Sequence, residues 1–196
     1  EGRPEAAFFI NATTHAREWA APEVATGTIE RLIDSADDGG WTRYLLDNTR
    51  LVIIPVHNID GFRQAQRYPT EAIVGQDPTV PSEWPRDGRM RRKNMRGVDE
   101  VLTTFNDHLL GIDLNRNHPP FWASSSQSTA NPAGLTHHGS AAQSEPETQA
   151  LVNAAQLGPE TRFRLGIDVH TFSRVFFSSN TARERLNAIQ SRLIGT

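Results

Sequence analysis

The sequence has 196 residues, of which 37% are hydrophobic and 22% charged, as expected for a globular chain that can bury one core of ordinary size. It has 0 cysteines, which excludes disulfides and thiolate metal ligands, and no apolar run approaches the ~20 residues that a membrane helix needs. The formal net charge of -3 gives no reason to expect a nucleic-acid partner, and we expect no membrane partner either.

Strands and helices are predicted to alternate along the first part of the chain. The apolar run at 6–10 predicts a buried strand, and residues 22–33 predict a helix. A short helix is expected at 41–48 and a buried strand at 51–56, which ends in a turn at Asp60-Gly61. The helix at 22–33 would bury one stripe of its surface, made of Val24, Ile29, Leu32 and Ile33.

The alternation continues after a long irregular segment. Residues 69–110 hold prolines at several positions and predict a loop, which in a compact domain is usually functional or mobile. Residues 111–117 predict a short strand that runs into a loop, 163–170 a further buried strand, and 181–193 an amphipathic helix. Strands that alternate with helices predict a layered α/β domain, with no sign of a repeat or a second domain.

A helix is also expected shortly before the strand at 163–170. Ser144 is predicted to cap its N-terminus, with Glu147 at the capping-box position, and the helix would extend to Leu157. Glu145 and Glu147 are therefore interpreted as residues that cap a helix, in preference to catalytic acids.

A histidine and a glutamate three residues apart lie between the first strand and the first helix. From such a turn His15 and Glu18 can face one point in space, and zinc takes imidazole nitrogen and carboxylate oxygen at ~2.0–2.2 Å. His170 closes a later strand, where its side chain can project from the sheet edge as a third ligand. A His-x-x-Glu pair also occurs on solvated helix faces, so the metal site depends on the segments that accompany the pair.

Two further segments offer cationic side chains near strand ends. Asn115 and Arg116 are well suited to a carboxylate, because the guanidinium donates two parallel hydrogen bonds and the amide adds a third. Arg92, in the basic run RRKN, is a second cationic element.

Six sequence words accompany these residues: THAREW, HNIDGF, RRKN, GIDLNRN, SEPET and DVHTFS. In these words and in their order the chain resembles the zinc carboxypeptidases of the carboxypeptidase A and B kind, although HNIDGF replaces the family's usual Asn-Pro-Asp-Gly. The resemblance implies an α/β fold with a mixed central β-sheet, helices on both faces, and an active site at the carboxyl ends of the strands.

The resemblance implies a role for each candidate residue. His15, Glu18 and His170 are the expected ligands of one catalytic zinc ion, which would keep an open position for water or substrate. Asn115 and Arg116 are expected to hold the free C-terminal carboxylate of a peptide or protein substrate.

Three further residues receive supporting roles from the same resemblance. Arg92 is expected to polarise the scissile carbonyl and stabilise its oxyanion, and Arg17 to contact the peptide further from its end. Asp113 is expected to orient His15, since zinc-bound imidazoles generally need such a partner. For Asp168 two interpretations stay open, a partner of a metal ligand and an ordinary acid at a strand end.

The other basic and imidazole side chains carry no predicted function. Arg91, Lys93 and Arg96 are expected to be solvated, and in a net acidic chain their cluster does not favour nucleic acid. His137 and His138 are expected at the surface. No partner pattern is identified for the remaining histidines, His57, His108 and His118.

Two departures from the family pattern qualify these expectations. The family's general-base Glu and substrate-capping Tyr come well after the third ligand, and neither is found before Thr196; few residues precede Ala6, where the family has strands. We therefore expect residues 1–196 to be a single partial peptidase catalytic domain, truncated at both ends, which organises zinc and the carboxylate clamp without normal turnover. Thr171-Phe172 also replaces a common Ser-Tyr, which puts a hydroxyl contact there in doubt.

The predicted reaction is zinc-dependent hydrolysis of the C-terminal peptide bond, with release of the C-terminal amino acid. One alternative is a related zinc amidase or endopeptidase that acts on cell-wall peptides, against which the intact Asn115-Arg116 pair argues. The other is a non-catalytic, zinc-dependent peptide-binding domain. We expect a monomer, and the family resemblance implies a secreted or periplasmic location.

Overall fold

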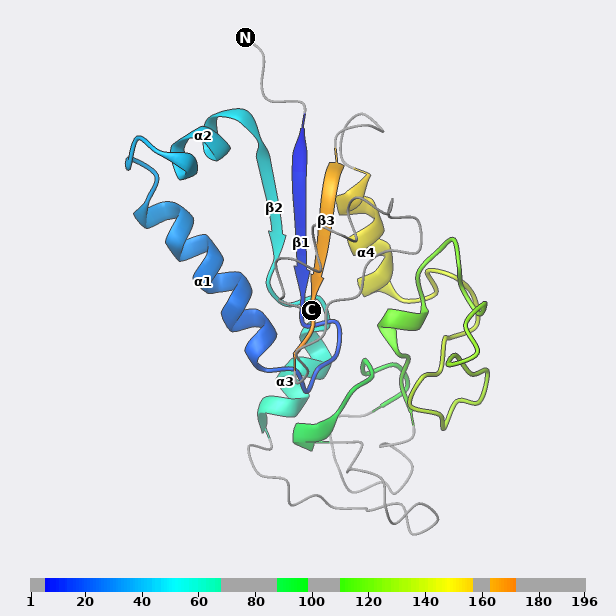
Figure 1. Cartoon of the computed structure of the whole chain (residues 1–196). Coiled ribbons are helices and arrows are strands. Elements are labelled where there is room, and N and C mark those ends of the chain that lie inside the picture. Colours follow the sequence, from blue (N-terminus) through cyan, green and yellow to red (C-terminus); the bar gives the residue numbers. More distant parts are fainter. Residues whose placement is uncertain (1–5, 68–87, 99–109, 157–162, 172–196) are drawn as a thin grey trace.

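The computed structural model of the protein describes residues 6–67, 88–98, 110–156 and 163–171 (Figure 1). In chain order the elements are β1 (Ala7–Ala12), α1 (Ala20–Asp34), α2 (Trp41–Asn48), β2 (Arg50–Ile54), α3 (Ile59–Arg67), the 3-10 turns η1 (Gly88–Met90) and η3 (Leu114–Arg116), α4 (Pro146–Ala155) and β3 (Phe163–Val169). None of the described helices is long and apolar enough to cross a bilayer.

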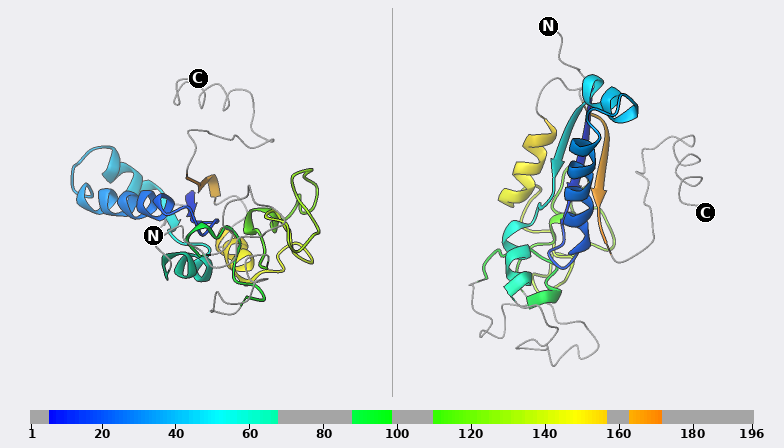
Figure 2. Two further views of the ribbon diagram at one scale, coloured as in Figure 1. Left: turned by 90° about the horizontal axis from the view of Figure 1, so that it is seen from below. Right: turned by 90° about the vertical axis from the view of Figure 1, so that its left-hand side faces the viewer.

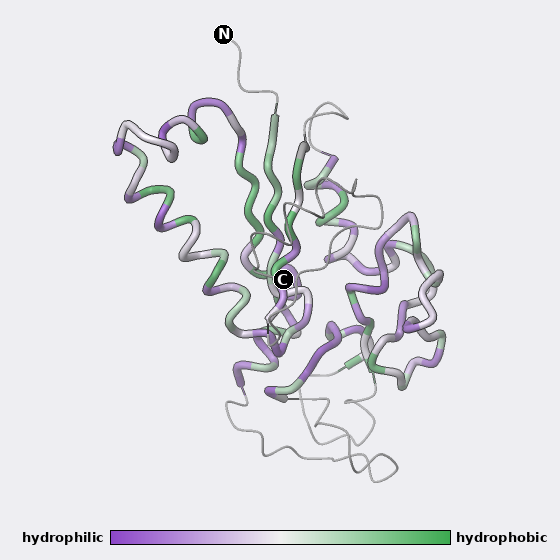
Figure 3. Tube along the Cα trace, in the orientation of Figure 1, coloured by the Kyte–Doolittle hydropathy of each residue, from purple (hydrophilic) through white to green (hydrophobic). Residues whose placement is uncertain are grey.

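Three parallel strands form the sheet, in the order β2-β1-β3. In the central strand β1, Ile10 pairs with Ile53 of β2 and with Ile167 of β3. Helices α1 and α4 lie on opposite faces of the sheet (Figures 1 and 2). The strands are accordingly apolar along most of their length (Figure 3), as is usual for parallel strands covered on both faces. Because the strands run in one direction, their carboxyl ends meet at one edge.

This arrangement confirms the predicted α/β class with helices on both faces. The described strands are all parallel, so the antiparallel strands expected of a mixed sheet are not among them. That residues 1–196 form a single domain stays a prediction. Of the predicted elements, the helix at 181–193 and most of the loop at 69–110 lie outside the described residues.

Helix α1 packs on the sheet through small side chains. Ala21 and Ala25 form the core cluster with Ala12 of β1, because small residues let the first turns of the helix approach the strand closely. The helix then diverges from the sheet (Figure 1), and an open apolar groove of about 460 Å³ lies between its later turns, α2 and β2. The predicted buried stripe is therefore wrong at Val24 and Ile33, which are 52% and 68% exposed.

The segment expected to be a turn at Asp60-Gly61 is the first turn of a helix. The Asn58 side chain accepts a hydrogen bond from the backbone of Gly61 at 3.1 Å, as an N-cap does, and α3 follows. A Cβ at position 61 would lie 2.5 Å from the Asn58 oxygen. The glycine therefore permits a close approach of backbone to cap, and the turn prediction is wrong.

The predicted short strand at 111–117 is also absent from the described sheet. Ile112 and Asp113 instead belong to an extended segment that leads into η3, and the Asp113 carboxylate accepts a hydrogen bond from the backbone of Asn115 at 3.0 Å. This cap bends the chain directly after Asp113, so the segment cannot continue as a strand.

Helix α4 begins later than predicted, and strand β3 is less buried. Ser144 does not cap α4: its hydroxyl donates to the Glu145 carboxylate at 2.8 Å, and the helix starts at Pro146. Strand β3 starts where it was predicted and ends one residue earlier, at Val169, but Leu165 and Ile167 are 48% and 37% exposed, because β3 is the outer strand of the described sheet.

Candidate metal centre

The turn after β1 brings the first two candidate ligands together. The backbone of Glu18 donates to the carbonyl of His15 at 3.1 Å, and Ala21 then donates to the carbonyl of Glu18, so the turn leads directly into α1. This closure directs both side chains to one side, with His15 Nδ1 2.7 Å from Glu18 Oε1. Both residues are buried.

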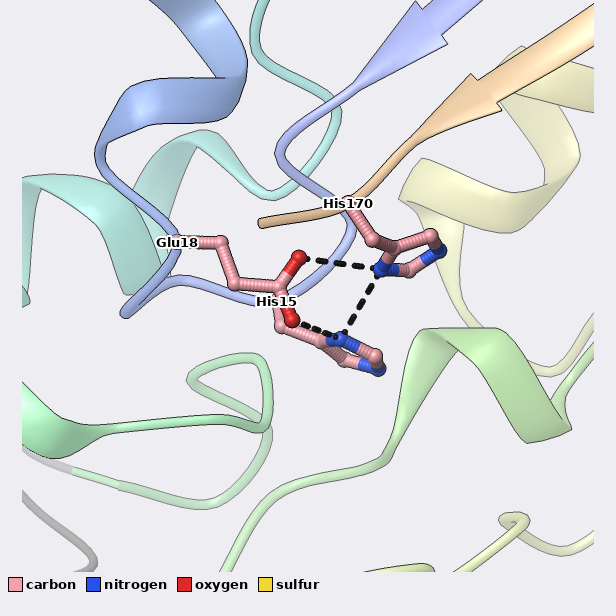
Figure 4. Close-up of side chains that lie close together, drawn as sticks. All are labelled: His15, Glu18 and His170. Atoms are coloured by element: carbon pink, nitrogen blue, oxygen red, sulfur yellow. Dashed lines mark hydrogen bonds and ion pairs between the residues drawn. The ribbon is translucent and has the colours of Figure 1, made fainter. Parts of the chain in front are cut away.

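His170 reaches the same point from β3. Since Ala12 pairs with Val169, the residues that follow β1 and β3 leave the sheet at the same edge. His170 Nδ1 lies 2.9 Å from Glu18 Oε2 and 3.2 Å from His15 Nδ1 (Figure 4). The structure thus brings the three predicted ligands together, with one donor atom of each within 4.8 Å of the others.

The far nitrogen of each imidazole faces a carboxylate. His15 Nε2 lies 3.2 Å from Asp113, and His170 Nε2 lies 3.0 Å from Asp168. A carboxylate only accepts hydrogen bonds, so both Nε2 atoms carry a proton, and a metal ion would bind at the two Nδ1 atoms in place of any proton shared with Glu18. Two imidazole nitrogens and one carboxylate that converge in this way fit the donor set of a zinc ion.

Ionisation supports this donor set. Burial raises the pKa of Glu18, but hydrogen bonds from His15 and His170 outweigh burial, and the pKa falls to about 2. Burial lowers the pKa of His170, yet hydrogen bonds to Asp168 and Glu18 raise it to about 10. Without a metal, a proton on His170 therefore supplies the positive charge that this group of carboxylates favours, and a metal ion would replace that proton.

Asp113 connects His15 to Arg92. The buried carboxylate accepts from His15 through Oδ1 and from Arg92 Nε and Nη2 through Oδ2, at 3.1 and 2.9 Å. Burial raises the pKa of Asp113, but the bond from His15 and the charge of Arg92 lower it well below its usual range. The contact expected between Asp113 and His15 is present, and its role in zinc binding stays a prediction.

Two guanidinium groups border the centre. Arg92 is held by Asp113 through two nitrogens, and its third, Nη1, lies 3.4 Å from His15 Nδ1, so it is directed toward the candidate ligands. Arg17 is half-buried, and burial together with the charge of Arg92 lowers its pKa. The contacts with a peptide that the resemblance implies for both residues stay predictions.

Asn115 and Arg116 lie on η3 and line a separate hollow. The hollow has a volume of about 580 Å³, and its other walls include His118, Phe121 and a run of serines. Arg116 Nη1 donates to the Asn115 carbonyl at 3.0 Å, while its buried Nε has no hydrogen-bond partner among the described residues. Asn115 and Arg116 are both partly exposed at this hollow, and the carboxylate contact that the resemblance implies for them stays a prediction.

The basic residues beside Arg92 differ from expectation. Arg91 and Lys93 were expected to be solvated, and both are buried. Arg91 donates to the carbonyls of Asn94 and Leu110 at 2.5 and 3.1 Å, and Lys93 donates to carbonyls of the loop at 132–134. They connect loops through backbone carbonyls, which a local pattern of charges does not reveal. Arg96 is exposed, as predicted.

Two histidines were also misjudged or missed. His138 is buried, against expectation, and contacts the Ser128 hydroxyl at 2.6 Å. His57 is buried between the Thr14 hydroxyl and the carbonyl of Glu147, at 3.3 and 3.0 Å, and burial lowers its pKa to about 4. His57 is the first residue of the motif HNIDGF, and this was the sequence signal that could have identified it as a buried residue near the site. His108 lies outside the described residues.

Glu145 is the N-cap residue of α4 but makes no side-chain cap bond, and the carboxylates of Glu145 and Glu147 both bind Asn94. The Asn94 amide donates to Glu145 at 2.8 Å and to Glu147 at 3.3 Å. Asn94 also accepts from the backbone of Ile112 at 2.8 Å, and its own backbone donates to the Ile112 carbonyl at 2.9 Å. Asn94 thus fastens the segments of Arg92 and Asp113 to the start of α4.

Comparison with known proteins agrees with this geometry. Mast cell carboxypeptidase A from Rattus norvegicus is 31% identical over 147 residues, which cover 75% of this chain and 29% of that protein. Carboxypeptidase O from Bos taurus is 31% identical over 148 residues, covering 76% and 32%. The chain spans about a third of the length of the curated relatives it matches.

Solved structures share the fold. Thrombin-activatable fibrinolysis inhibitor matches with a TM-score of 0.69 and 21% identity, over 98% of this chain and 43% of that one. Carboxypeptidase A from Helicoverpa armigera matches with a TM-score of 0.65 and 24% identity, over 97% and 39%. The family model described as zinc carboxypeptidase matches residues 1–186, which confirms the resemblance found in the sequence words. The chain belongs to the zinc carboxypeptidase family.

Proposed function

We propose that the protein hydrolyses the C-terminal peptide bond of peptides or proteins with one zinc ion bound by His15, Glu18 and His170. The observation that carries the proposal is the convergence of the two Nδ1 atoms and the Glu18 carboxylate, with both Nε2 atoms turned to other acids. Family membership supports zinc as the metal. When bound, zinc polarises the substrate carbonyl and lowers the pKa of a bound water.

In this proposal, substrate binding begins at the carboxylate. Asn115 and Arg116, which line the hollow at η3 and are partly exposed there, hold the free C-terminal carboxylate. A bidentate contact of this kind fixes the end of the peptide and sets which bond is cut. An internal peptide bond presents no such carboxylate, so this pair favours release of a single terminal residue.

Arg92 stabilises the negative charge that develops on the carbonyl oxygen. Asp113 holds its Nε and Nη2, so the guanidinium is fixed before substrate arrives and Nη1 is directed to the centre. A donor that is fixed in advance needs no reorganisation during the reaction. Arg17 contacts the peptide further from its end.

The described carboxylates of the centre are not available to take the proton from the attacking water. The carboxylates of Asp113 and Asp168 are each occupied by an imidazole Nε2, and Glu18 is a ligand. A base must lie within hydrogen-bond reach of that water, so we assign this step to none of the described residues.

The test measures zinc content and activity in the same samples of the complete protein. Hippuryl-Phe and hippuryl-Arg serve as free-acid substrates, and their amidated forms as matched controls. We expect about one zinc per chain, loss of activity with chelator, and cleavage of free-acid substrates in preference to amides. Equal cleavage of both forms would favour an endopeptidase or amidase, and zinc binding without cleavage would favour a binding domain. A monomeric state and a secreted or periplasmic location stay predictions.

A further inference from the structure

We propose that Asp168 is a positioning residue for His170: its carboxylate accepts the hydrogen bond of ring Nε2 and keeps Nδ1 directed at the metal centre. This inference rests on the proposed function, because it concerns the same centre. His170 has Nε2 3.0 Å from Asp168 and Nδ1 2.9 Å from Glu18, so the two sides of the ring are held by two acids. A ring held in this way cannot turn Nδ1 away without losing both contacts.

Asp168 is itself fixed by two buried donors, Asn11 on β1 and Thr14 in the turn that follows it. Its Oδ1 accepts from the Asn11 amide at 2.8 Å and from the Thr14 hydroxyl at 3.2 Å. Asn11 lies opposite Asp168 in the register of β1 and β3, and both Asn11 and Thr14 are buried. The other oxygen, Oδ2, lies 3.0 Å from His170 Nε2, with the Thr14 hydroxyl as a longer contact at 3.5 Å. The shortest contact of Oδ1 is therefore with Asn11 of β1, and the shortest contact of Oδ2 is with the candidate ligand.

The arrangement repeats on the other histidine, with one difference. Asp113 accepts from His15 Nε2 and gives its second oxygen to Arg92, whereas the second oxygen of Asp168 binds Asn11. Loss of Asp113 therefore disturbs both a ligand and the guanidinium proposed to stabilise the oxyanion. Loss of Asp168 should disturb the ligand alone, which separates metal affinity from the catalytic step.

A purely structural role for Asp168 predicts a different relation between the Asn11 and Asp168 variants. If Asp168 only ties β3 to β1, then Asn11→Ala, which removes the same inter-strand bond, should have the same effect as Asp168→Ala. If Asp168 positions His170, Asn11→Ala should matter much less, since the acid remains next to the ring. Circular dichroism and thermal unfolding of both variants measure the structural part separately.

An exchange of the two side chains sharpens the test. In Asp168→Asn the amide offers one oxygen and one NH₂ group, so it cannot accept from both Asn11 and His170. In the double variant Asn11→Asp/Asp168→Asn, the amide can donate to the new carboxylate on β1 and accept from His170 Nε2. The swap restores both hydrogen bonds without restoring the original acid, and it remains informative if Asp168→Ala folds poorly.

The experiment determines zinc affinity by chelator competition and the visible absorption spectrum of the Co²⁺-substituted, complete protein. We expect Asp168→Ala to weaken zinc binding by ~10–100-fold and to change the cobalt spectrum. Asp168→Asn should behave similarly, Asn11→Ala should lose much less, and the double variant should recover most of the affinity. At saturating zinc, Asp168→Ala should retain more of its kcat than Asp113→Ala.

Two outcomes would overturn the inference: wild-type zinc affinity with an unchanged cobalt spectrum in Asp168→Ala, or equal losses in Asn11→Ala and Asp168→Ala. These outcomes leave the proposed peptidase function intact if the wild type binds zinc and cleaves free-acid peptides. Conversely, a wild type that binds zinc but cleaves nothing would refute the proposed function, while weaker zinc binding in Asp168→Ala would still support this role.

Discussion

The two ends of the sheet differ in which side chains are buried. At the carboxyl end, polar side chains are buried and joined by hydrogen bonds, among them Thr14, Asn58, Arg91, Asn94 and Asp113. At the other end, around the groove between α1, α2 and β2, apolar side chains are exposed, with Trp41 at 81% and Tyr44 at 58%.

This difference indicates where the chain tolerates change. A buried polar group costs free energy unless it is hydrogen-bonded, so removal of one partner at the carboxyl end leaves others unsatisfied. Exposed apolar side chains have few partners to lose. The metal centre and the substrate clamp thus occupy the region in which each residue depends most on its neighbours.

The strongest test of the carboxyl end is removal of a candidate ligand. His15→Ala and His170→Ala should each lose most of their zinc, a larger effect than the ~10–100-fold expected for residues that only orient a ligand. Metal analysis by mass spectrometry after dialysis measures this, with Trp41→Ser at the other end as the control. Full zinc occupancy in both histidine variants would contradict the assignment.

The carboxylate clamp should produce the next largest effect. Charge-assisted hydrogen bonds contribute ~1.5–3 kcal/mol each, so Arg116→Ala should reduce kcat/KM on free-acid peptides by roughly 10²-fold or more. Amidated peptides lack the carboxylate and should be affected far less. An equal reduction on both substrates would mean that Arg116 serves another purpose.

Asp113 should affect binding and turnover together. Asp113→Ala should weaken zinc binding by ~10–100-fold, because it removes the acceptor of His15 Nε2. It also frees Arg92, so kcat should fall even at saturating zinc, in contrast to the Asp168 variant. Titration with zinc followed by kinetics at saturation separates the two effects. An unchanged kcat at saturation would show that Arg92 does not need Asp113.

The buried imidazole of His57 predicts a pH dependence of stability. Burial lowers its pKa to about 4 in the folded protein, against ~6.5 in the unfolded chain, so between these values the unfolded chain binds more protons. This contribution to the free energy of unfolding is complete above pH ~6.5 and decreases toward pH 4, by at most ~1.4 kcal/mol per pH unit. Urea unfolding at pH 7, 6 and 5 measures it.

The matched variant for this prediction is His57→Gln, which has no titrating ring. Its free energy of unfolding should depend less on pH than that of the wild type over the same window, whatever its stability at pH 7. Trp41→Ser should keep the wild-type pH dependence. Identical slopes for the wild type and His57→Gln would exclude His57 as the source.

The smallest effect is expected at the exposed apolar end. Trp41→Ser should change the free energy of unfolding by no more than ~0.5 kcal/mol, as surface substitutions usually do. Asn94→Ala, by contrast, removes the partner of the Ile112 backbone N–H and of Oε2 of Glu145, whose other oxygen keeps Ser144, and should cost ~1–3 kcal/mol or more. A large loss in Trp41→Ser would show that another part of the protein covers this side chain.

The candidate ligands were predictable because their geometry is local. His15 and Glu18 are brought together by one turn, and His170 follows a strand whose apolar pattern is clear in the sequence. The sheet's helices and strands followed from the same periodic patterns. The sequence words then related these segments to one another, which spacing alone could not do.

What could not be predicted depends on contacts between distant segments. The sequence around Arg91 predicts a solvated charge, because its acceptor, the carbonyl of Leu110, lies 19 positions away. Asp60-Gly61 predicts a turn, because the sequence does not show that the Asn58 side chain occupies the space beside Gly61 where a Cβ would lie. Asp168 stayed open because its partners, Asn11 on β1 and Thr14 after it, become its neighbours only through the pairing of β1 with β3.

The candidate ligands also have a consequence for the chain as a whole. His170 is 155 positions from His15 and 152 from Glu18, so a metal ion bound by all three would act as a removable cross-link across nearly the whole described chain. Cross-links that close long loops restrict the unfolded chain most. A single proteolytic cut in the exposed loop near Phe121 would then leave two fragments joined through the ion, and a chelator would weaken their association.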